Sequence, residues 1–311
     1  MKNTLFIGNG LNRCLKNSIS WGDLMEYVSK ELEVSYHSEI AMPLEFERMV
    51  NEYLEKANQG GTEIYSDIKD IICRRTNDVR LPENALHYEI SKLKMDSVIT
   101  TNYDYLLEYV YNNDYEYISG LGRNKYLFES TSKQKGVEFY HAHGLSGAKN
   151  TLCLGYEHYM GVVQHLRESL NSKTDGEMKI KRIICGDEKP KYTWGEKFYT
   201  DNIYFVGFQL DECESDIWWL LTHRAYLYYS NIYEMRWKLK NKIIFYDILD
   251  MRPSGNEQKE KSRKLNVQRK LNRYELLRKL NVIVREYELK NEDDTYQETY
   301  LKIFDDIRKE S

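Results

Sequence analysis

Residues 98–108 read VITTNYDYLLE, and this stretch decides the expected fold. An apolar run ends in two threonines, Asn102 and Asp104 follow, and a helical pattern begins at Tyr103. A buried strand that passes directly into a helix is the repeating unit of an α/β sheet. The polar residues at this junction are therefore expected at a carboxyl strand end, where such sheets bind their ligands.

The same alternation continues on both sides of this stretch. Apolar runs predict strands at Thr4–Ile7, Ser97–Thr101, Phe139–Ala142, Leu152–Leu154, Ile203–Val206, Lys242–Ile248 and Val282–Tyr287. Helical patterns are expected from residue 103, near 157–170, at 214–229, near 258–280 and from 295. Together they predict an α/β fold with a doubly wound, mostly parallel, Rossmann-like sheet. We expect one domain over residues 1–311, in which residues 251–311 form a helix–strand–helix unit that completes the sheet.

Residues 22–95 are expected to form a helical insertion after the first strand and its loop. Ser20 and Asp23 have the spacing of a capping box, and apolar residues then recur at every fourth position. Pro43 and Pro82 are expected to open two further helices, and Gly60-Gly61 to end the first of these.

Composition excludes several function classes. Five scattered cysteines show no metal-ligand spacing, so we expect no metal site and a reducing, cytoplasmic setting. The net charge of −4 gives no reason to expect a nucleic-acid binder, so contact with nucleic acid is expected only through a partner. No apolar run approaches the roughly 18 residues that a membrane helix needs. The 27 tyrosines suggest many half-buried or interface positions.

Residues 6–10 read FIGNG and follow the first expected strand. A Gly-x-Gly turn at this place lets the backbone approach a pyrophosphate closely. The third glycine of the dinucleotide-binding pattern is absent, because Arg13 stands in its place. A tight turn with no ligand is therefore an equal alternative.

Two other strand ends carry polar residues suited to catalysis. Asn102 offers a donor and an acceptor without charge, which suits a group that orients a sugar or a water; turn formation by Asn102 and helix capping by Asp104 are the alternatives. In FYHAHGLSG, residues 139–147, His143 follows a strand and precedes a glycine. A histidine there can serve as a general base, although a given histidine is more often structural.

The later strand ends carry weaker signals. In IYFVGFQLDECESDIWWLL, residues 203–221, Gly207 is a place where ribose or phosphate can meet the backbone. Asp216 is either an acid at a helix start or a site residue. Trp218 and Trp219 are expected in the core or at an interface rather than at a ligand. Asp247, at the end of KIIFYD, is placed for an adenosine ribose.

Taken in this order, the segments between about residues 4 and 250 resemble the sirtuin-like family. TTNYD followed by the pair His143-Gly144 is the most specific part, and ISWGDL at 19–24 is similar to the family's segment after the glycine loop. The resemblance implies a site for NAD, bound as substrate, with Asn102 and His143 as the catalytic pair at its nicotinamide ribose. The expected NAD-binding residues are Gly8, Asn9, Gly10, Asn12, Thr101, Asp104, Gly207 and Asp247.

The sequence departs from the deacylase sirtuins in ways that argue against protein deacylation. It has no four-cysteine zinc module, and Asn9 and Asn12 stand where that pattern favours Ala and Ser. These departures fit the bacterial antiphage branch, in which sirtuin-like domains hydrolyse NAD, as in Thoeris-type systems. The resemblance thus implies an NAD glycohydrolase that acts in abortive infection, as a homo-oligomer or with a defence-system partner protein.

Two alternatives remain at this stage. The same motifs are compatible with a non-catalytic sensor of NAD or ADP-ribose that regulates a partner, and, less favourably, with a zinc-free deacylase. A separate feature is the basic stretch at residues 259–279, which is interpreted as a solvated helix face in preference to a surface for nucleic acid or an acidic partner.

Overall fold

The computed structural model describes residues 1–16, 18–57, 63–77, 79–114, 118–230 and 233–311. Within these residues, a seven-stranded sheet has the order β3-β4-β2-β1-β7-β8-β9. Only the β3–β4 pair among them is antiparallel. The doubly wound, mostly parallel α/β fold is therefore confirmed. The strands are β1 (Asn3–Ile7), β2 (Ser97–Thr100), β3 (Ser132–Gln134), β4 (Val137–His141), β7 (Asn202–Val206), β8 (Ile243–Asp250) and β9 (Ile283–Leu289).

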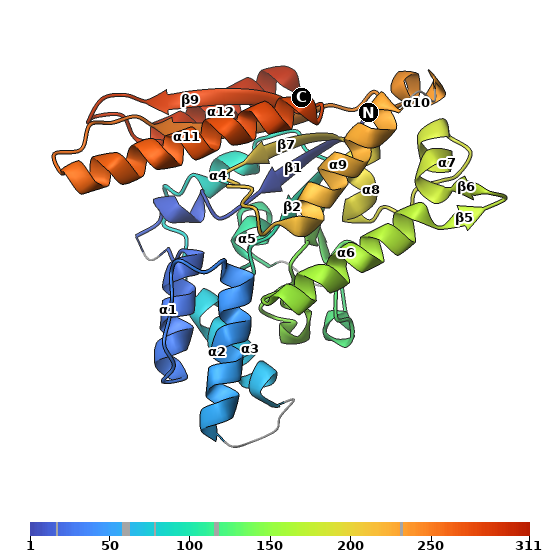
Figure 1. The fold of residues 1–311 in the computed structure, drawn as a ribbon. Helices are drawn as coiled ribbons and strands as arrows, with labels where there is room; N and C mark the ends of the chain where they lie inside the picture. The colour runs from blue at the N-terminus through green and yellow to red at the C-terminus, as the bar shows by residue number, and fades with distance from the viewer. Residues whose placement is uncertain (17, 58–62, 78, 115–117, 231–232) are drawn as a thin grey trace.

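Helices cover both faces of this sheet (Figure 1). One face packs against α6 (Tyr156–Asn171), α8 (Trp194–Thr200), α9 (Ser215–Tyr229) and the end of α11 (Glu257–Lys279). The other face packs against α4 (His87–Ile90), α5 (Leu106–Tyr111) and α12 (Tyr296–Glu310). Alternation along β1 explains this layering, because Phe6 enters the first core while Leu5 and Ile7 enter the second.

The insertion between β1 and β2 is helical and has a core of its own. Helices α1 (Trp21–Glu31), α2 (Met42–Ala57) and α3 (Glu63–Asn77) lie together, apart from α11 and α12 (Figure 1). Tyr103 and Leu152 from the main body complete this core, so it packs onto the loops that follow the strands. The expected capping box at Ser20 and Asp23 is confirmed. The predicted helix end at Gly60-Gly61 lies outside the described residues.

Several predicted elements differ in the structure. Leu152–Leu154 is buried but is not a strand, since a short apolar run fits any buried segment. The helix opened by Pro82 is only α4, and the helix expected from Tyr103 begins later, at α5. Strand β8 extends beyond the predicted end at Ile248. Elements that the sequence did not indicate are β3, β5 (Lys173–Thr174), β6 (Glu177–Met178), α7 (Lys179–Cys185), α8 and α10 (Tyr233–Lys238).

No helix in the described part of the chain combines the length and apolar character that a membrane span requires.

The loops after β1 and β7 meet backbone to backbone at the centre of the sheet. Gly8 N–H donates to the Val206 carbonyl at 3.2 Å, and Gly10 N–H donates to the Gly207 carbonyl at 2.7 Å. A Cβ at Gly8 would lie 2.6 Å from the Gly207 oxygen and 2.7 Å from the Phe208 Cα. Only glycine fits this crossing without moving backbone.

We predict that Gly8→Ala lowers the free energy of unfolding by about 1–3 kcal/mol, the usual cost of overpacking. Gly255→Ala is the matched control, because a Cβ there would meet nothing within 4 Å. Urea denaturation followed by circular dichroism compares the two variants. Equal midpoints would show that the crossing tolerates a methyl group.

Candidate functional site

Four adjacent strands end together and carry the predicted site residues. Strands β4, β2, β1 and β7 are neighbours in the sheet, and Thr100 pairs in register with both Ile7 and His141. The residues that follow these strands therefore share one edge, as expected for a parallel sheet. In sheet order they are His143, Asn102, Gly8 and Gly207.

Asn102 lies at a small pocket that we call the asparagine cavity. It has a volume of about 40 Å³, and Asn9, Asn12, Asn102 and Asp104 all line it. The remaining wall comes from residues 18–21, Leu24, Thr76, Val79 and Tyr103, so the helical insertion closes it. The Asn9 side-chain amide donates to the Ile19 carbonyl at 2.8 Å, which ties the glycine loop to the start of α1.

The polar side chains of this cavity are already partnered. Asn12 donates to Asp104 at 2.8 Å and contacts His87 Nε2 at 2.8 Å. Asp104 also accepts the backbone N–H of Leu106 at the start of α5, which is the capping role considered as an alternative. Burial raises the pKa of Asp104 and lowers that of His87 to about 4, so the histidine is neutral.

Asn102 is held at the centre of the strand ends. Its backbone N–H donates to the Thr100 hydroxyl at 3.0 Å, and its side-chain amide donates to the Gly8 carbonyl at 3.4 Å. The neighbouring Thr101 is buried and does not line the asparagine cavity. The side-chain oxygen of Asn102 has no hydrogen-bond partner that the structure records among the described residues, which leaves it an acceptor for a ligand.

Three other predicted residues lie in a second space, the glycine cavity, of about 530 Å³. Gly10, Gly207 and Asp247 line it together with Lys270 and Tyr300. Asp247 is not at a strand tip as predicted, because β8 continues to Asp250. Its carboxylate accepts hydrogen bonds from Lys270 Nζ and the Tyr274 hydroxyl, both at 2.8 Å.

The two glycines are also required by the fold itself, for a reason that does not involve a ligand. A Cβ at Gly10 would lie 2.6 Å from the Gly207 Cα, and Gly207 itself has a φ of 62°. The contact between the two loops thus requires small residues at both places. This is the tight-turn alternative, and it holds whether or not a phosphate approaches.

His143 lies apart from both cavities, in a buried acidic cluster. Its Nε2 is 2.9 Å from Asp216 Oδ2 and 3.7 Å from Glu214 Oε2, and the histidine side chain is 1% exposed. The ring also packs edge-on against Tyr159 at a centroid distance of 5.0 Å. Among the described residues no hydrogen bond joins His143 to Asn102. Asp216 is therefore more than an acid at a helix start, and Glu214 is a neighbour that the sequence analysis missed.

The cluster perturbs its own ionisation. Burial alone lowers the pKa of His143, but the carboxylates of Asp216 and Glu214 outweigh it and raise that pKa. Burial raises the pKa of Glu214 to about 7, against the attraction of the imidazolium. Because two carboxylates share one histidine, one of them is favoured in its protonated form. The three groups place ligand atoms within 4.8 Å of one another, so they are also the set that could hold a cation.

The other histidine of this motif has a structural role. His141 Nε2 is 2.9 Å from Glu108 Oε1, and its Nδ1 is 2.9 Å from the Asn102 carbonyl oxygen. Both side chains are completely buried. The pair anchors the segment that carries Asn102 to α5, and it positions the polar loop without facing either cavity.

Residues 96–211 match the family model of the SIR2-like domain. The match begins just before β2 and ends after β7, so it includes Asn102, His143 and Gly207. Gly8, Gly10, Asp216 and Asp247 lie outside it. A search of curated proteins finds no match to this chain.

We predict that Glu214 makes the stability of the protein depend on pH. Its folded pKa of about 7 exceeds the ordinary value of 4.5, so its contribution is present below pH 4.5 and is lost as pH rises through 7. The glutamine in Glu214→Gln stays neutral at every pH, so the variant keeps that contribution. Between pH 5 and pH 8 the free energy of unfolding of the wild type should therefore fall by up to about 3 kcal/mol relative to that of the variant. Urea denaturation across this range measures the difference.

The exposed neighbour Glu212 supplies the control through Glu212→Gln, whose profile should parallel that of the wild type. Parallel profiles for Glu214→Gln as well would mean that Glu214 titrates normally in the folded protein.

Proposed function

We propose that this protein cleaves NAD at the nicotinamide–ribose bond and releases nicotinamide and ADP-ribose. The observation that carries the proposal is the placement of Asn102 and His143 after the adjacent strands β2 and β4, inside the segment that matches the SIR2-like domain. Such domains imply an NAD-related function, and the SIR2-like match and the sheet edge point to the same residues.

The chemistry requires little from the protein beyond position and charge. Nicotinamide leaves a cationic ring as a neutral molecule, so its departure needs no general acid. The barrier is an oxocarbenium-like ribose, as in glycoside cleavage. We assign Asn102 to orienting the ribose or the attacking water, and His143 to accepting a proton from a ribose hydroxyl or that water. Asp216, at 2.9 Å, would stabilise the imidazolium that forms.

The two cavities suggest how the substrate would lie. The glycine cavity is large enough for the adenosine side of NAD. Asp247 would accept a hydrogen bond from a ribose hydroxyl there, in place of the bond that Lys270 or Tyr274 now donates to it. The asparagine cavity, beside Asn102, would receive the nicotinamide side. Gly8, Asn9, Gly10, Asn12, Thr101, Asp104 and Gly207 surround the passage between them in this proposal.

The biological role that best fits such an activity is an abortive-infection effector against phage. NAD loss without restraint would kill the host, so the activity needs a trigger, a homo-oligomer or a defence-system partner. The non-catalytic sensor of NAD or ADP-ribose is the second candidate, and the observation that favours it is the burial of His143 in an ion pair. The experiments below distinguish the two.

Asn102→Ala and His143→Ala should each reduce NAD cleavage by at least about 100-fold, the lower end of a general-base contribution. His165→Ala and Asn124→Ala are matched controls, because both side chains are exposed and lie outside the two cavities. Nicotinamide release is measured by chromatography, alone and with proteins encoded beside the gene. Near wild-type rates in either site variant would refute the catalytic assignment. Binding of NAD with no cleavage under any condition would favour the sensor.

The asparagine cavity is small in the described state. Its volume of about 40 Å³ is far below the range of about 300–1,000 Å³ typical of small-molecule sites. Trp21, at the start of α1, packs edge-on against Tyr103 at 5.1 Å and forms part of the wall. We infer that the helical insertion must move before NAD is cleaved, as inserted lids do.

Trp21→Ala should therefore tighten NAD binding several-fold by removing part of the lid, whereas Trp237→Ala, at a 74% exposed position, should not. Calorimetric titration with NAD measures both. Turnover of the wild type should also rise with protein concentration or with the cognate partner. Full activity in an isolated monomer, together with unchanged affinity in Trp21→Ala, would exclude this gating.

A further inference from the structure

A large concave surface lies along α11, outside the proposed cleavage site. This α11 groove has a volume of about 1270 Å³, above the range of about 300–1,000 Å³ typical of small-molecule sites. It adjoins the glycine cavity, with which it shares Gln209, Ile248, Lys270 and Tyr296. Its α11 wall runs from Gln258 to Leu276, or roughly 27 Å at 1.5 Å per residue.

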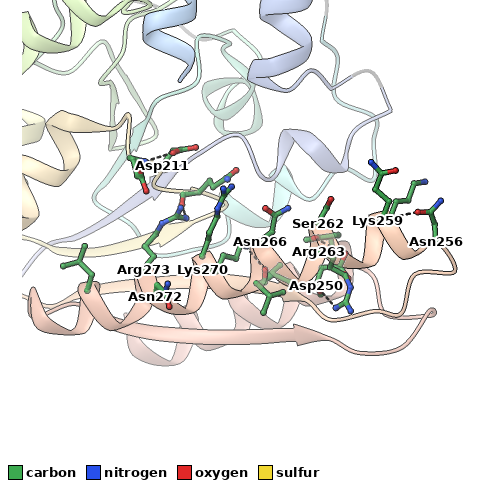
Figure 2. A pocket seen from close by; sticks show the side chains of 18 of the residues that line it. Asp211, Asp250, Asn256, Lys259, Ser262, Arg263, Asn266, Lys270, Asn272 and Arg273 are labelled. Atoms are coloured by element: carbon green, nitrogen blue, oxygen red, sulfur yellow. Dashed lines mark hydrogen bonds between the residues drawn. The ribbon is translucent and has the colours of Figure 1, made fainter. Parts of the chain in front are cut away.

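Helix α11 contributes little to the core along most of this wall. Its buried residues are Tyr274 and Leu277, both near its end, and none of residues 257–273 is buried. Most of this stretch is polar, and its leucines Leu265 and Leu271 are exposed, so packing explains little of the helix there. Figure 2 shows Lys259, Asn266, Lys270 and Arg273 projecting from α11 on the side of the loop that carries Asp211.

The groove concentrates positive charge in a protein whose net charge is −4. Some of its cations are fixed in place: Lys270 by Asp247 at 2.8 Å, and Arg273 by the Gln209 carbonyl at 2.5 Å. Arg263 is paired with Glu260 and also donates to the Asp250 carbonyl. Lys259 and Arg269 have no side-chain hydrogen-bond or ion-pair partner in the part of the chain that the structure describes. The lining cations are Lys259, Arg263, Arg269, Lys270 and Arg273.

Along α11 itself, Glu260 neutralises Arg263, and the acids that line the groove lie on other elements. Asp250 is paired with Arg252 at 2.5 Å, and Asp211 and Glu212 belong to the loop beyond β7, on the opposite wall. The rest of the lining is rich in groups that contact bases. Side-chain amides read base edges, and aromatic rings stack on base faces. These groups are Gln209, Asn256, Gln258, Asn266, Asn272, Trp218 and Tyr296.

We propose that the α11 groove binds a short single-stranded nucleic acid. Cations spread over roughly 20 Å of helix suit a chain of phosphates better than one phosphate group. The chain's phosphates run along Lys259, Arg263, Arg269 and Arg273, and its bases face the amides and Trp218. This revises the interpretation of the basic stretch as a merely solvated face, and it is independent of NAD cleavage.

The test uses fluorescence anisotropy with a labelled 12-nucleotide single strand, as DNA and as RNA, at several salt concentrations and without NAD. For a single strand, each phosphate contact contributes about −0.7 to the slope of log K, the logarithm of the binding constant, against the logarithm of the salt concentration. Five cations therefore allow a slope no steeper than about −3.5. Lys259→Ala combined with Arg269→Ala removes two cations that hold no recorded partner, so folding should be unaffected. The slope should become shallower by about 1.4, with affinity roughly 60-fold weaker at 50 mM salt.

Lys261→Ala combined with Lys279→Ala is the matched control, because these exposed lysines lie on α11 outside the groove and also hold no recorded partner among the described residues. An equal loss in the control pair would overturn the proposal, since binding would then follow the charge of the whole helix. If ADP at equal phosphate concentration displaced the labelled strand, the groove would be a nucleotide site and the proposal would be overturned. Displacement by polyglutamate, or no binding at 50 mM salt, would equally overturn it.

Discussion

The contact between the backbones of the β1 and β7 loops sets the positions of the candidate site residues at the carboxyl edge of the sheet. Strand β1 is central and fully buried beyond its first residue, with β2 on one side and β7 on the other. Because Gly8 and Gly10 donate hydrogen bonds across to β7 and Gly207, the chain leaves β1 in one direction only. That direction sets where Asn9 and Asn12 point, and the Asn9 amide then fixes the start of the helical insertion. A shift at this crossing would move both cavities together.

The two ends of the central strands use buried polar groups for different purposes. At the amino ends, Lys197 Nζ lies 2.9 Å from Ser97 Oγ and 3.4 Å from Asp201, whose carboxylate accepts the Thr4 hydroxyl at 2.9 Å. This network is satisfied on both sides, so it fixes strand register at little cost. At the carboxyl ends, His143, Glu214 and Asp216 each retain a buried side-chain atom without a hydrogen-bond partner in the structure. Unsatisfied buried groups are costly, so this cluster does not stabilise the fold as the amino-end network does, and this agrees with the proposed role of His143.

The sequence predicted the features that depend on local pattern. Buried strands such as Ile203–Val206 and the capping box at Ser20 follow from apolar runs and from three-residue spacing, which need no tertiary information. Asn102, Asn9 and Asp104 could be grouped because parallel strands end at one edge. The partner of His143 could not be predicted, because Glu214 and Asp216 approach it only through the packing of α9 on the sheet. Asp247 was misplaced for a similar reason, since pairing with β9 extends β8 past the end of its apolar run.

Charge distribution connects the proposed cleavage site with the α11 groove. The asparagine cavity and the acidic cluster beside His143 contain carboxylates, which favour a cationic nicotinamide ring or an oxocarbenium-like ribose over an anion. The glycine cavity joins a wall of lysine and arginine at Lys270, which favours phosphate. If NAD spans the two cavities as proposed, its cationic ring lies near carboxylates and its phosphates lie near Lys270. The glycine cavity and the α11 groove meet at Gln209, Ile248, Lys270 and Tyr296, which line both, and Lys270 already holds Asp247.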